Sequence, residues 1–212
     1  MPINLSFKDL VNKLTLRLQE KLPGPSAHEV MRAVPVGTDI PTFDHNTPPK
    51  AASVLILLYP DQDEIFFPLI QRNIYKGVHS GQISLPGGTA EPGETPIATA
   101  LREAEEEIGI LASDVTVVGR LSEFYVIPSN FNVAPIIGFA TSRPEFIRDP
   151  TEVEKIIFGN LSHLLSDDAI KRKEILAAGR YALMAPHFDV EGYLVWGATA
   201  MILNELRMVL RE

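Results

Sequence analysis

Apolar residues near the N-terminus of the chain recur at helical spacing. This spacing predicts an amphipathic helix over residues 6–22, which Ser6 is well placed to cap. Ser26 and Glu29 have the spacing of a capping box, so a second, short helix is expected after Ser26. Residues 34–50 are rich in Pro and Thr and predict a long loop or the edge of a lid.

Short apolar runs separated by turn residues predict strands along most of the remaining chain. The predicted strands cover residues 51–59, 64–72, 83–85, 115–127, 133–140, 153–158, 171–176, 181–188 and 193–196. Helices are predicted at 96–108 and 198–210, with a helical turn at 161–166. A mixed sheet with a helix on each side is typical of a layered α/β/α sandwich.

Two residues shape the predicted strands. Gly119 allows the strand 115–127 to bend. Pro135 has no N–H to donate, and it therefore favours a place at the edge of the sheet for the strand 133–140.

The stretch from Gly88 to Ile110 reads GTAEPGETPIATALREAEEEIGI and holds the most informative pattern in the chain. Thr95 is a good N-cap for its helix, and Gly109 is a natural stop. The apolar face of this helix is expected to consist of Ile97, Ala100, Leu101, Ala104 and Ile108.

Three acidic residues of this helix, Glu103, Glu106 and Glu107, stand at i, i+3 and i+4, so their carboxylates are expected on one face. Hard divalent cations such as Mg²⁺ prefer such oxygen ligands, together with water and substrate phosphates. The turn before the helix contains Gly88, whose carbonyl is a further candidate ligand. Arg102 lies among these acids and is expected to orient a carboxylate, while Glu94 is expected to brace Arg102.

The spacing G-x5-E-x7-R-E-x2-E-E-x-G, made by Gly88, Glu94, Arg102, Glu103, Glu106, Glu107 and Gly109, resembles the Nudix box of the Nudix hydrolases. This resemblance implies a Nudix-type α/β/α sandwich with a mixed sheet, in which residues 88–110 form the box. It also implies an enzyme that uses Mg²⁺ or Mn²⁺ to hydrolyse a nucleoside diphosphate linkage. Metal ligands are then expected at Glu103, Glu106, Glu107 and Gly88, and catalytic roles at Glu106, Glu103 and Arg102.

The general base is left open between two places. In some Nudix hydrolases it is a glutamate of the box, and in others it is a glutamate on a distant loop. Glu152, which follows a loop flanked by prolines and precedes a predicted strand, is the distant candidate here.

Residues upstream of the box, in the runs 69–72, 79–82 and 85–88, resemble the extra motif of coenzyme A pyrophosphatases. The run Trp196-Gly197-Ala198-Thr199-Ala200 resembles the same subgroup. This resemblance implies that coenzyme A or acyl-CoA is split into 4′-phosphopantetheine, or its acyl form, and adenosine 3′,5′-bisphosphate. Substrate contacts are expected at Arg72, Lys76, His79, Gly81 and Gly87, because a strand-end arginine such as Arg72 can fork onto a phosphate.

Two alternatives remain open. Gly77 stands where the coenzyme A subgroup has arginine, which favours another Nudix substrate such as ADP-ribose, NADH or an NDP-sugar. A Nudix-like domain that binds a nucleotide as a regulator, without hydrolysis, is the alternative of another class. Loss of a glutamate from the box would indicate such a regulator, and this box has lost none.

Composition sets outer limits on this picture. The chain has 212 residues, 45% hydrophobic and 22% charged, which predicts a single domain over residues 1–212 with 1–50 as an N-terminal extension. The net charge is −8 and there is no basic stripe, which argues against nucleic acid as a partner. The longest apolar run, 51–59, is too short for a membrane span.

The remaining expectations concern location and single residues. The chain has no cysteine, which excludes disulfides and thiolate catalysis. Its first residues lack the pattern of a secretory signal, so we expect a cytoplasmic protein. The family resemblance adds a homodimer as an expectation. His28 and His45 are expected to be structural or exposed, and Trp196 and Thr199 to pack in the core.

Overall fold

The computed structural model describes residues 6–73 and 81–211 and has an α/β fold. Its helices are α1 (Phe7–Arg17), α2 (Pro25–Val30), α3 (Pro96–Ile108), α4 (Leu161–Leu165) and α5 (Gly197–Arg211), with 3₁₀ turns at Ala112–Asp114 and Ile127–Ser129. Its strands are β1 (Val34–Pro35), β2 (Lys50–Asp61), β3 (Glu64–Arg72), β4 (Ile83–Ser84), β5 (Gly87–Thr89), β6 (Thr116–Arg120), β7 (Phe124–Val126), β8 (Phe131–Phe139), β9 (Val153–Asn160), β10 (Lys171–Ala177), β11 (Tyr181–Val190) and β12 (Tyr193–Trp196).

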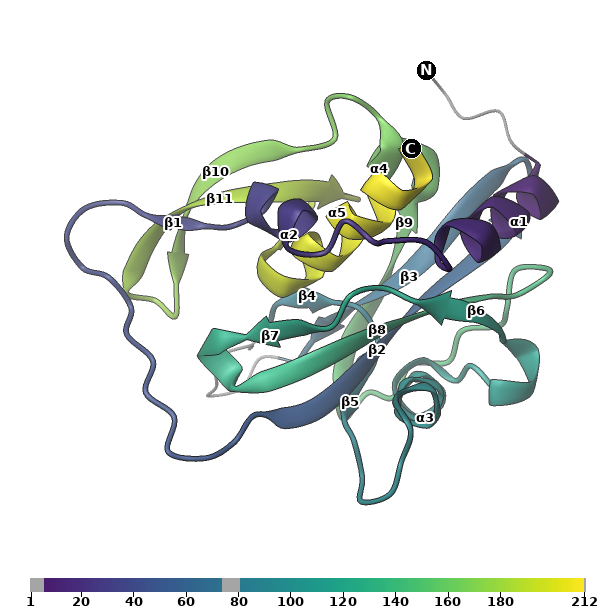
Figure 1. The fold of residues 1–212 in the computed structure, drawn as a ribbon, viewed down its shortest axis with the longest axis horizontal. Coiled ribbons are helices and arrows are strands. Elements are labelled where there is room, and N and C mark those ends of the chain that lie inside the picture. The colour runs from purple at the N-terminus through teal and green to yellow at the C-terminus, as the bar shows by residue number, and fades with distance from the viewer. Residues whose placement is uncertain (1–5, 74–80, 212) are drawn as a thin grey trace.

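The larger sheet has eight strands, with the order β4-β3-β2-β8-β6 along its main path. In addition, β5 pairs with β2, β7 with β8, and β9 with β3. β2 and β8 run parallel at its centre, whereas the other pairs are antiparallel (Figure 1). The predicted mixed sheet is therefore confirmed.

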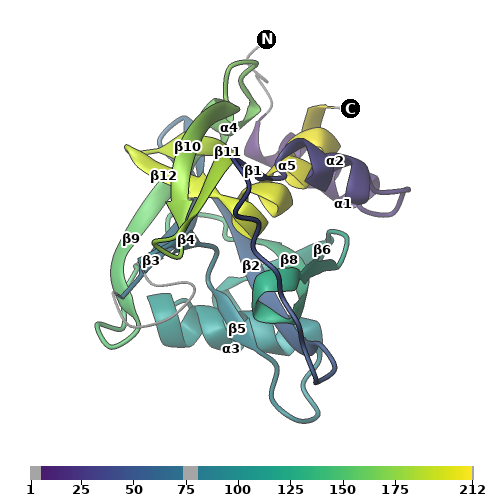
Figure 2. The same cartoon turned by 90° about the vertical axis from the view of Figure 1, so that its left-hand side faces the viewer.

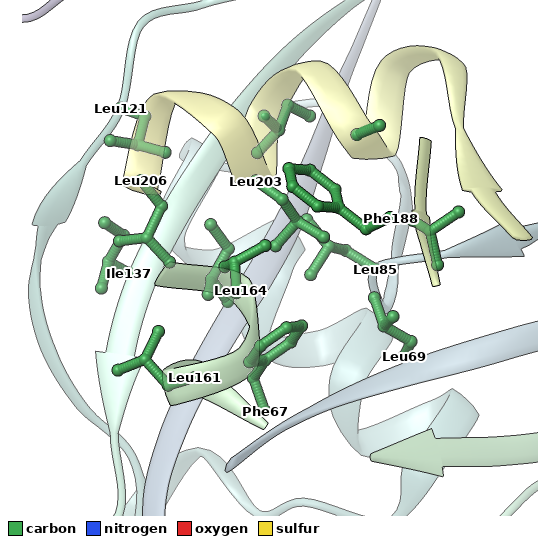
Figure 3. Packing of buried hydrophobic residues seen from close by; sticks show 14 of the residues in the cluster. Phe67, Leu69, Leu85, Leu121, Ile137, Leu161, Leu164, Phe188, Leu203 and Leu206 are labelled. Atoms are coloured by element: carbon green, nitrogen blue, oxygen red, sulfur yellow. The ribbon is translucent and has the colours of Figure 1, made fainter. Parts of the chain in front are cut away.

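Helices cover both faces of this sheet (Figure 2). β2 alternates between them: Leu55 and Leu57 join a buried cluster with α3, while Ile56 and Leu58 join a second cluster with α1 and α5. Figure 3 shows Leu203 and Leu206 of α5 pointing toward the sheet in the second cluster. The expected α/β/α layering is thus confirmed.

A smaller antiparallel sheet, β1-β11-β10 with β12 beside β11, packs against α5. Its edge strand β1 lies in the predicted loop 34–50, where Val34 pairs with Met184. The rest of that segment, 36–49, runs outside the sheets as a long connection to β2 (Figure 1). The loop prediction is therefore right for 36–49 and wrong for Val34 and Pro35, which form β1, and for Lys50, which begins β2.

The N-terminal helices differ from the sequence predictions at their ends. α1 has the predicted N-cap, since the Ser6 hydroxyl accepts from the Asp9 N–H, but α1 ends at Arg17. The apolar spacing that continues to Leu22 belongs to a turn that packs on the core. The predicted capping box is wrong: α2 begins one residue before Ser26, whose hydroxyl donates to the Pro23 carbonyl at 2.8 Å.

The predicted strand 115–127 is divided into two strands, β6 and β7. This break also explains why the edge position predicted for the strand with Pro135 is wrong. β8 is a central strand, although Pro135 predicted an edge. Residues 121–123 separate β6 from β7 opposite Pro135, so the missing N–H of the proline falls where the ladder is interrupted. The Leu121 N–H still donates to the Pro135 carbonyl at 2.9 Å.

Among the described residues, no helix has both the length and the apolar character that crossing a membrane requires.

Candidate active site

The acidic helix α3 has the predicted ends. The Thr95 hydroxyl accepts from the Ala98 N–H at 3.2 Å, and Gly109 ends the helix with φ +73°. Ala100, Ala104 and Ile108 are buried as predicted, but Ile97 is 44% exposed. The first buried residue of α3 is Thr99, so the helix meets the sheet later than the apolar spacing predicts.

The Gly-Gly segment before α3 is a short strand rather than the tight turn expected from sequence. β5 pairs with β2, with Gly87 opposite Val54. A Cβ on Gly87 would lie 2.3 Å from the Ser53 carbonyl oxygen, and one on Gly88 would lie 2.5 Å from the Glu103 carboxylate. Glycine is required at Gly87, where the contact is with backbone, whereas at Gly88 a Cβ would meet only the end of the Glu103 side chain.

Glu107 is the most buried acid of the site, with 2% of its surface exposed. Its Oε2 accepts from the Gly87 N–H at 2.8 Å. Burial raises the pKa of Glu107 to about 7, against the opposing effect of Arg72. The Arg72 guanidinium donates to the Gly87 carbonyl at 3.1 Å and lies 3.9 Å from Glu107 Oε1. Arg72 is therefore the cation nearest to the Gly-Gly segment among the described contacts.

Arg102 ties the other acids together. It donates to Glu94 Oε1 and to Glu106 Oε2, both at 2.8 Å, and pairs with Glu103 at 3.0 Å. A further hydrogen bond to the Thr89 carbonyl, at 3.1 Å, attaches it to β5. The hydrogen bond from Arg102 lowers the pKa of Glu94 to about 2. These contacts are those expected of a residue that orients carboxylates and is braced by Glu94.

The three predicted metal ligands differ in their surroundings. Glu107 is buried, Glu103 is 15% exposed, and Glu106 is 58% exposed and turned to Arg102. In the part of the chain that the structure describes, no group of three or more His, Cys, Asp or Glu side chains is arranged to hold an ion. Glu103 and Glu106 share the Arg102 guanidinium, whereas Glu107 turns away from them to the Gly87 N–H.

The donor chemistry nevertheless fits a hard divalent cation. Glu103 lies against Gly88, and Glu107 against Gly87, so two carboxylates meet the Gly-Gly backbone at one place. Burial raises the pKa of Glu103 as well as that of Glu107, which is the environment in which a cation would stabilise both charges. Assignment of Glu103, Glu106, Glu107 and Gly88 as ligands stays a prediction.

The remaining predicted site residues lie on the loop side of the site. Glu152 is exposed just before β9, and its charge raises the pKa of both Glu103 and Glu107. Gly81, with φ +68°, donates to the Asn73 carbonyl at 3.3 Å and closes the loop after β3. The predicted substrate contacts Lys76 and His79 lie outside the described residues.

A cavity of about 1000 Å³ opens beside Gly87, Gly88 and Arg72. Most of its lining residues are apolar or aromatic. They come from many parts of the chain, among them the end of α2, β1, the segment 36–49, β2, β7, β8, β11 and the start of α5. Its charged lining residues in the described ranges 6–73 and 81–211 are Arg32 and Arg72, with no carboxylate among them. The cavity thus joins the polar site to a large apolar space.

Sequence reasoning missed most of this cavity. Trp196 and Thr199, expected to pack in the core, both line it, although Thr199 is also buried and donates to the Ile83 carbonyl at 3.3 Å. Phe43 lines it from the segment that was expected to be a loop. The run 196–200 could have indicated this cavity, because it is a distinctive motif outside the box and its residues 196–199 line the cavity.

Residues 49–178, more than half of the chain, match the family model described as NUDIX domain. The chain belongs to the Nudix family. Its relatives include "Nudix hydrolase 15, mitochondrial" of Arabidopsis thaliana, with 37% identity over 77% of this chain and 60% of the relative. "Nudix hydrolase 3" of Caenorhabditis elegans is 42% identical over 74% of this chain and 71% of the relative. The chain therefore spans less than two thirds of the Arabidopsis protein's length.

Solved structures agree on the Nudix fold. The Nudix hydrolase RenU from M. Smegmatis has a TM-score of 0.51 at 18% identity, covering 77% of this chain and 86% of that chain. A MutT/nudix family protein from Enterococcus faecalis has a TM-score of 0.50 at 15% identity, covering 98% of this chain and 76% of that chain. The Nudix fold is therefore confirmed, in agreement with the family match.

Proposed function

We propose that this Nudix protein hydrolyses the diphosphate of coenzyme A or acyl-CoA with Mg²⁺ or Mn²⁺. The products would be 4′-phosphopantetheine, or its acyl form, and adenosine 3′,5′-bisphosphate. One observation carries the proposal: a large apolar cavity adjoins the Gly-Gly segment of the box, and its charged lining residues in the described part of the chain are arginines.

The shape of coenzyme A suits this arrangement. Its diphosphate lies between a nucleotide and a long pantetheine arm, so a binding site needs a polar centre beside a large apolar space. Ligand pockets typically reach up to about 1000 Å³ with a few polar groups that fix orientation. The protein carries a net charge of −8, which repels an anionic substrate. Because the described lining of the cavity contains no carboxylate, this repulsion is reduced where the substrate would bind.

The box residues divide the work of binding and orientation. Glu103, Glu106, Glu107 and the Gly88 carbonyl would hold the metal ion. A bound Mg²⁺ or Mn²⁺ supplies charge neutralisation at the phosphoryl oxygens and lowers the pKa of an attacking water. Arg102 fixes the orientation of Glu103 and Glu106, and Arg72 presents its guanidinium at the mouth of the site toward the diphosphate.

The proton of the attacking water needs an acceptor. Glu152 is exposed, and after burial its charge also contributes to the raised pKa of Glu103 and Glu107, which supports Glu152 as a candidate acceptor. Glu103 and Glu106 are the box candidates for this role. A Glu152→Gln variant that keeps metal affinity but loses kcat would assign the base to Glu152, whereas unchanged kcat would leave it to the box.

The direct test incubates the protein with coenzyme A, ADP-ribose, NADH and an NDP-sugar in separate reactions with Mg²⁺ or Mn²⁺, and resolves the products by chromatography. Glu106→Gln is the inactive variant, and Glu105→Gln, an exposed neighbour on the same helix, is its matched control. Fastest release of adenosine 3′,5′-bisphosphate from coenzyme A, lost only in Glu106→Gln, supports the proposal. Preference for ADP-ribose, NADH or the sugar nucleotide overturns the substrate assignment.

Absence of any turnover would favour the non-catalytic regulator. The box retains all of its glutamates, which argues for catalysis. The cytoplasmic location, the homodimer and the absence of nucleic-acid or membrane partners stay predictions, and cell fractionation and light scattering test the first two. The Arabidopsis relatives are named mitochondrial and chloroplastic.

A further inference from the structure

His28 of α2 lies in the wall of the cavity with 6% of its surface exposed. Its Nε2 is 2.9 Å from Oε2 of Glu205, a residue of α5 with no exposed surface. The other oxygen of Glu205 accepts from the Ser122 hydroxyl at 2.6 Å and from the Gly24 N–H at 3.0 Å. The His28 ring also packs edge-on against Phe124. These contacts fix the ring, and Nδ1 has no partner among the described residues.

Arg32 lines the same cavity four residues after His28. Its side chain is 60% exposed and pairs with Glu29 at 2.8 Å. An exposed ion pair of this kind is weak, so a ligand anion can readily replace Glu29 as the partner of Arg32. His28 and Arg32 together are called the α2 edge below.

The α2 edge is separate from the box. α2 packs against α5, whereas Arg72 ends β3 and binds Gly87 (Figure 2). Among the described lining residues the charged groups are Arg32, which follows α2, and Arg72, which ends β3, and most of the other lining residues are apolar. A ligand that satisfies both arginines carries two anionic groups.

We propose that the α2 edge is a second anion-recognition point, which binds the ribose 3′-phosphate of coenzyme A while the diphosphate lies at the box. The Arg32 guanidinium provides a forked pair of donors for phosphate oxygens. Nδ1 of His28 pairs with a phosphate in either protonation state of the ring, because a phosphomonoester offers both P–O acceptors and a P–OH donor. The proposal rests on the proposed function and specifies which nucleotide the enzyme selects.

The rival explanation is that His28 and Glu205 only hold α2 to α5. That explanation predicts equal effects on every substrate, because a misplaced α2 disturbs the whole cavity. Coenzyme A and dephospho-coenzyme A differ only in the 3′-phosphate, so comparing them separates the two explanations.

The experiment measures kcat and KM for both compounds with Mg²⁺, using wild type, Arg32→Met and His28→Gln. Glutamine at position 28 keeps a donor for Glu205 while removing the ring nitrogen from the cavity. Arg120→Met is the matched control, because Arg120 is 59% exposed and pairs with Glu123 three residues away, outside the cavity. We expect KM for coenzyme A to rise about tenfold in both α2-edge variants, with KM for dephospho-coenzyme A and kcat unchanged.

Equal losses on the two compounds, or no loss on coenzyme A, would overturn the proposal. If the wild-type protein hydrolyses neither compound, the proposed function fails. The α2 edge is then tested by calorimetry, which measures the affinity of the protein for adenosine 3′,5′-bisphosphate and for AMP. Tighter binding of the bisphosphate, abolished by Arg32→Met and kept by Arg120→Met, would retain the second anion point. Equal affinity for the two nucleotides would remove it.

Discussion

The box and the cavity meet at Gly87 and Gly88 but are built in opposite ways. The box is polar and comes from one continuous stretch, in which Arg102 and its carboxylate partners are held by hydrogen bonds of 2.8 to 3.2 Å. The cavity is mainly apolar and is assembled from α2, the segment 36–49, β7, β11 and α5. We infer that the box determines the reaction and the cavity determines which diphosphate is cut.

This difference predicts different losses. Variants of the box should lower kcat for every diphosphate, because all substrates share the group that is attacked. Variants of the cavity should change KM and the ranking of substrates while kcat stays close to wild type.

Glu107→Gln is expected to have the largest effect, a fall in kcat of about a thousandfold for all substrates, because a buried charge of the proposed metal site is lost. The fold should survive, since glutamine still accepts from the Gly87 N–H and burial already disfavours the charge on Glu107. Activity assays and thermal denaturation are measured together, with Glu105→Gln as the control. A variant that loses stability instead of kcat would show that Glu107 is structural.

Gly87→Ala should come next and should act on folding. The new Cβ would lie 2.3 Å from the Ser53 carbonyl at a φ of +151°, so we expect a loss of about 3 kcal/mol in the free energy of unfolding. Gly88→Ala is the matched variant, because its Cβ meets only the end of the Glu103 side chain. It should keep stability and lose activity. Equal stability losses in urea denaturation would contradict this division.

Ala198→Phe tests the cavity alone. Ala198 lines the cavity at the start of α5, and a larger side chain there takes up space that the ligand needs. KM for coenzyme A should rise about tenfold with kcat nearly unchanged. A fall in kcat without a change in KM would place Ala198 in the chemistry of the box.

The smallest effect concerns Glu205 and pH. Burial alone raises the pKa of Glu205, but hydrogen bonds from His28, Ser122 and Gly24 outweigh burial and leave the pKa below its ordinary value of 4.5. The ionised Glu205 carboxylate therefore stabilises the folded state fully above about pH 4.5. This contribution is lost as pH falls through the lower pKa that Glu205 has in the folded protein. The difference in Tm between wild type and Glu205→Gln should shrink below this pH. If the difference in Tm stays constant from pH 7 to pH 3.5, Glu205 does not stabilise the folded protein as an ionised carboxylate.

The two regions also differ in how far the sequence predicts them. Thr95, Gly109 and the glutamates of α3 are local signals, because capping and helical spacing need only neighbouring residues. β5 was not predicted, since a Gly-Gly pair indicates a turn unless the strand that it lies against is known. The same holds for Pro135, whose place in a central strand depends on the break between β6 and β7.

The cavity needed contacts that span much of the chain. His28 and Glu205 are 177 residues apart, and no local pattern connects them. The arrangement of the metal ligands was also beyond sequence reasoning, because helical spacing does not reveal that Glu106 turns to Arg102 while Glu107 turns to Gly87.

A crystal structure with Mn²⁺ and adenosine 3′,5′-bisphosphate tests this division of roles most directly, because anomalous scattering locates the ion independently of the nucleotide. We predict the Mn²⁺ signal between Glu103, Glu106, Glu107 and the Gly88 carbonyl, with the nucleotide in the cavity and its 3′-phosphate at Arg32. An ion bound away from α3, or a nucleotide bound outside the cavity, would contradict it.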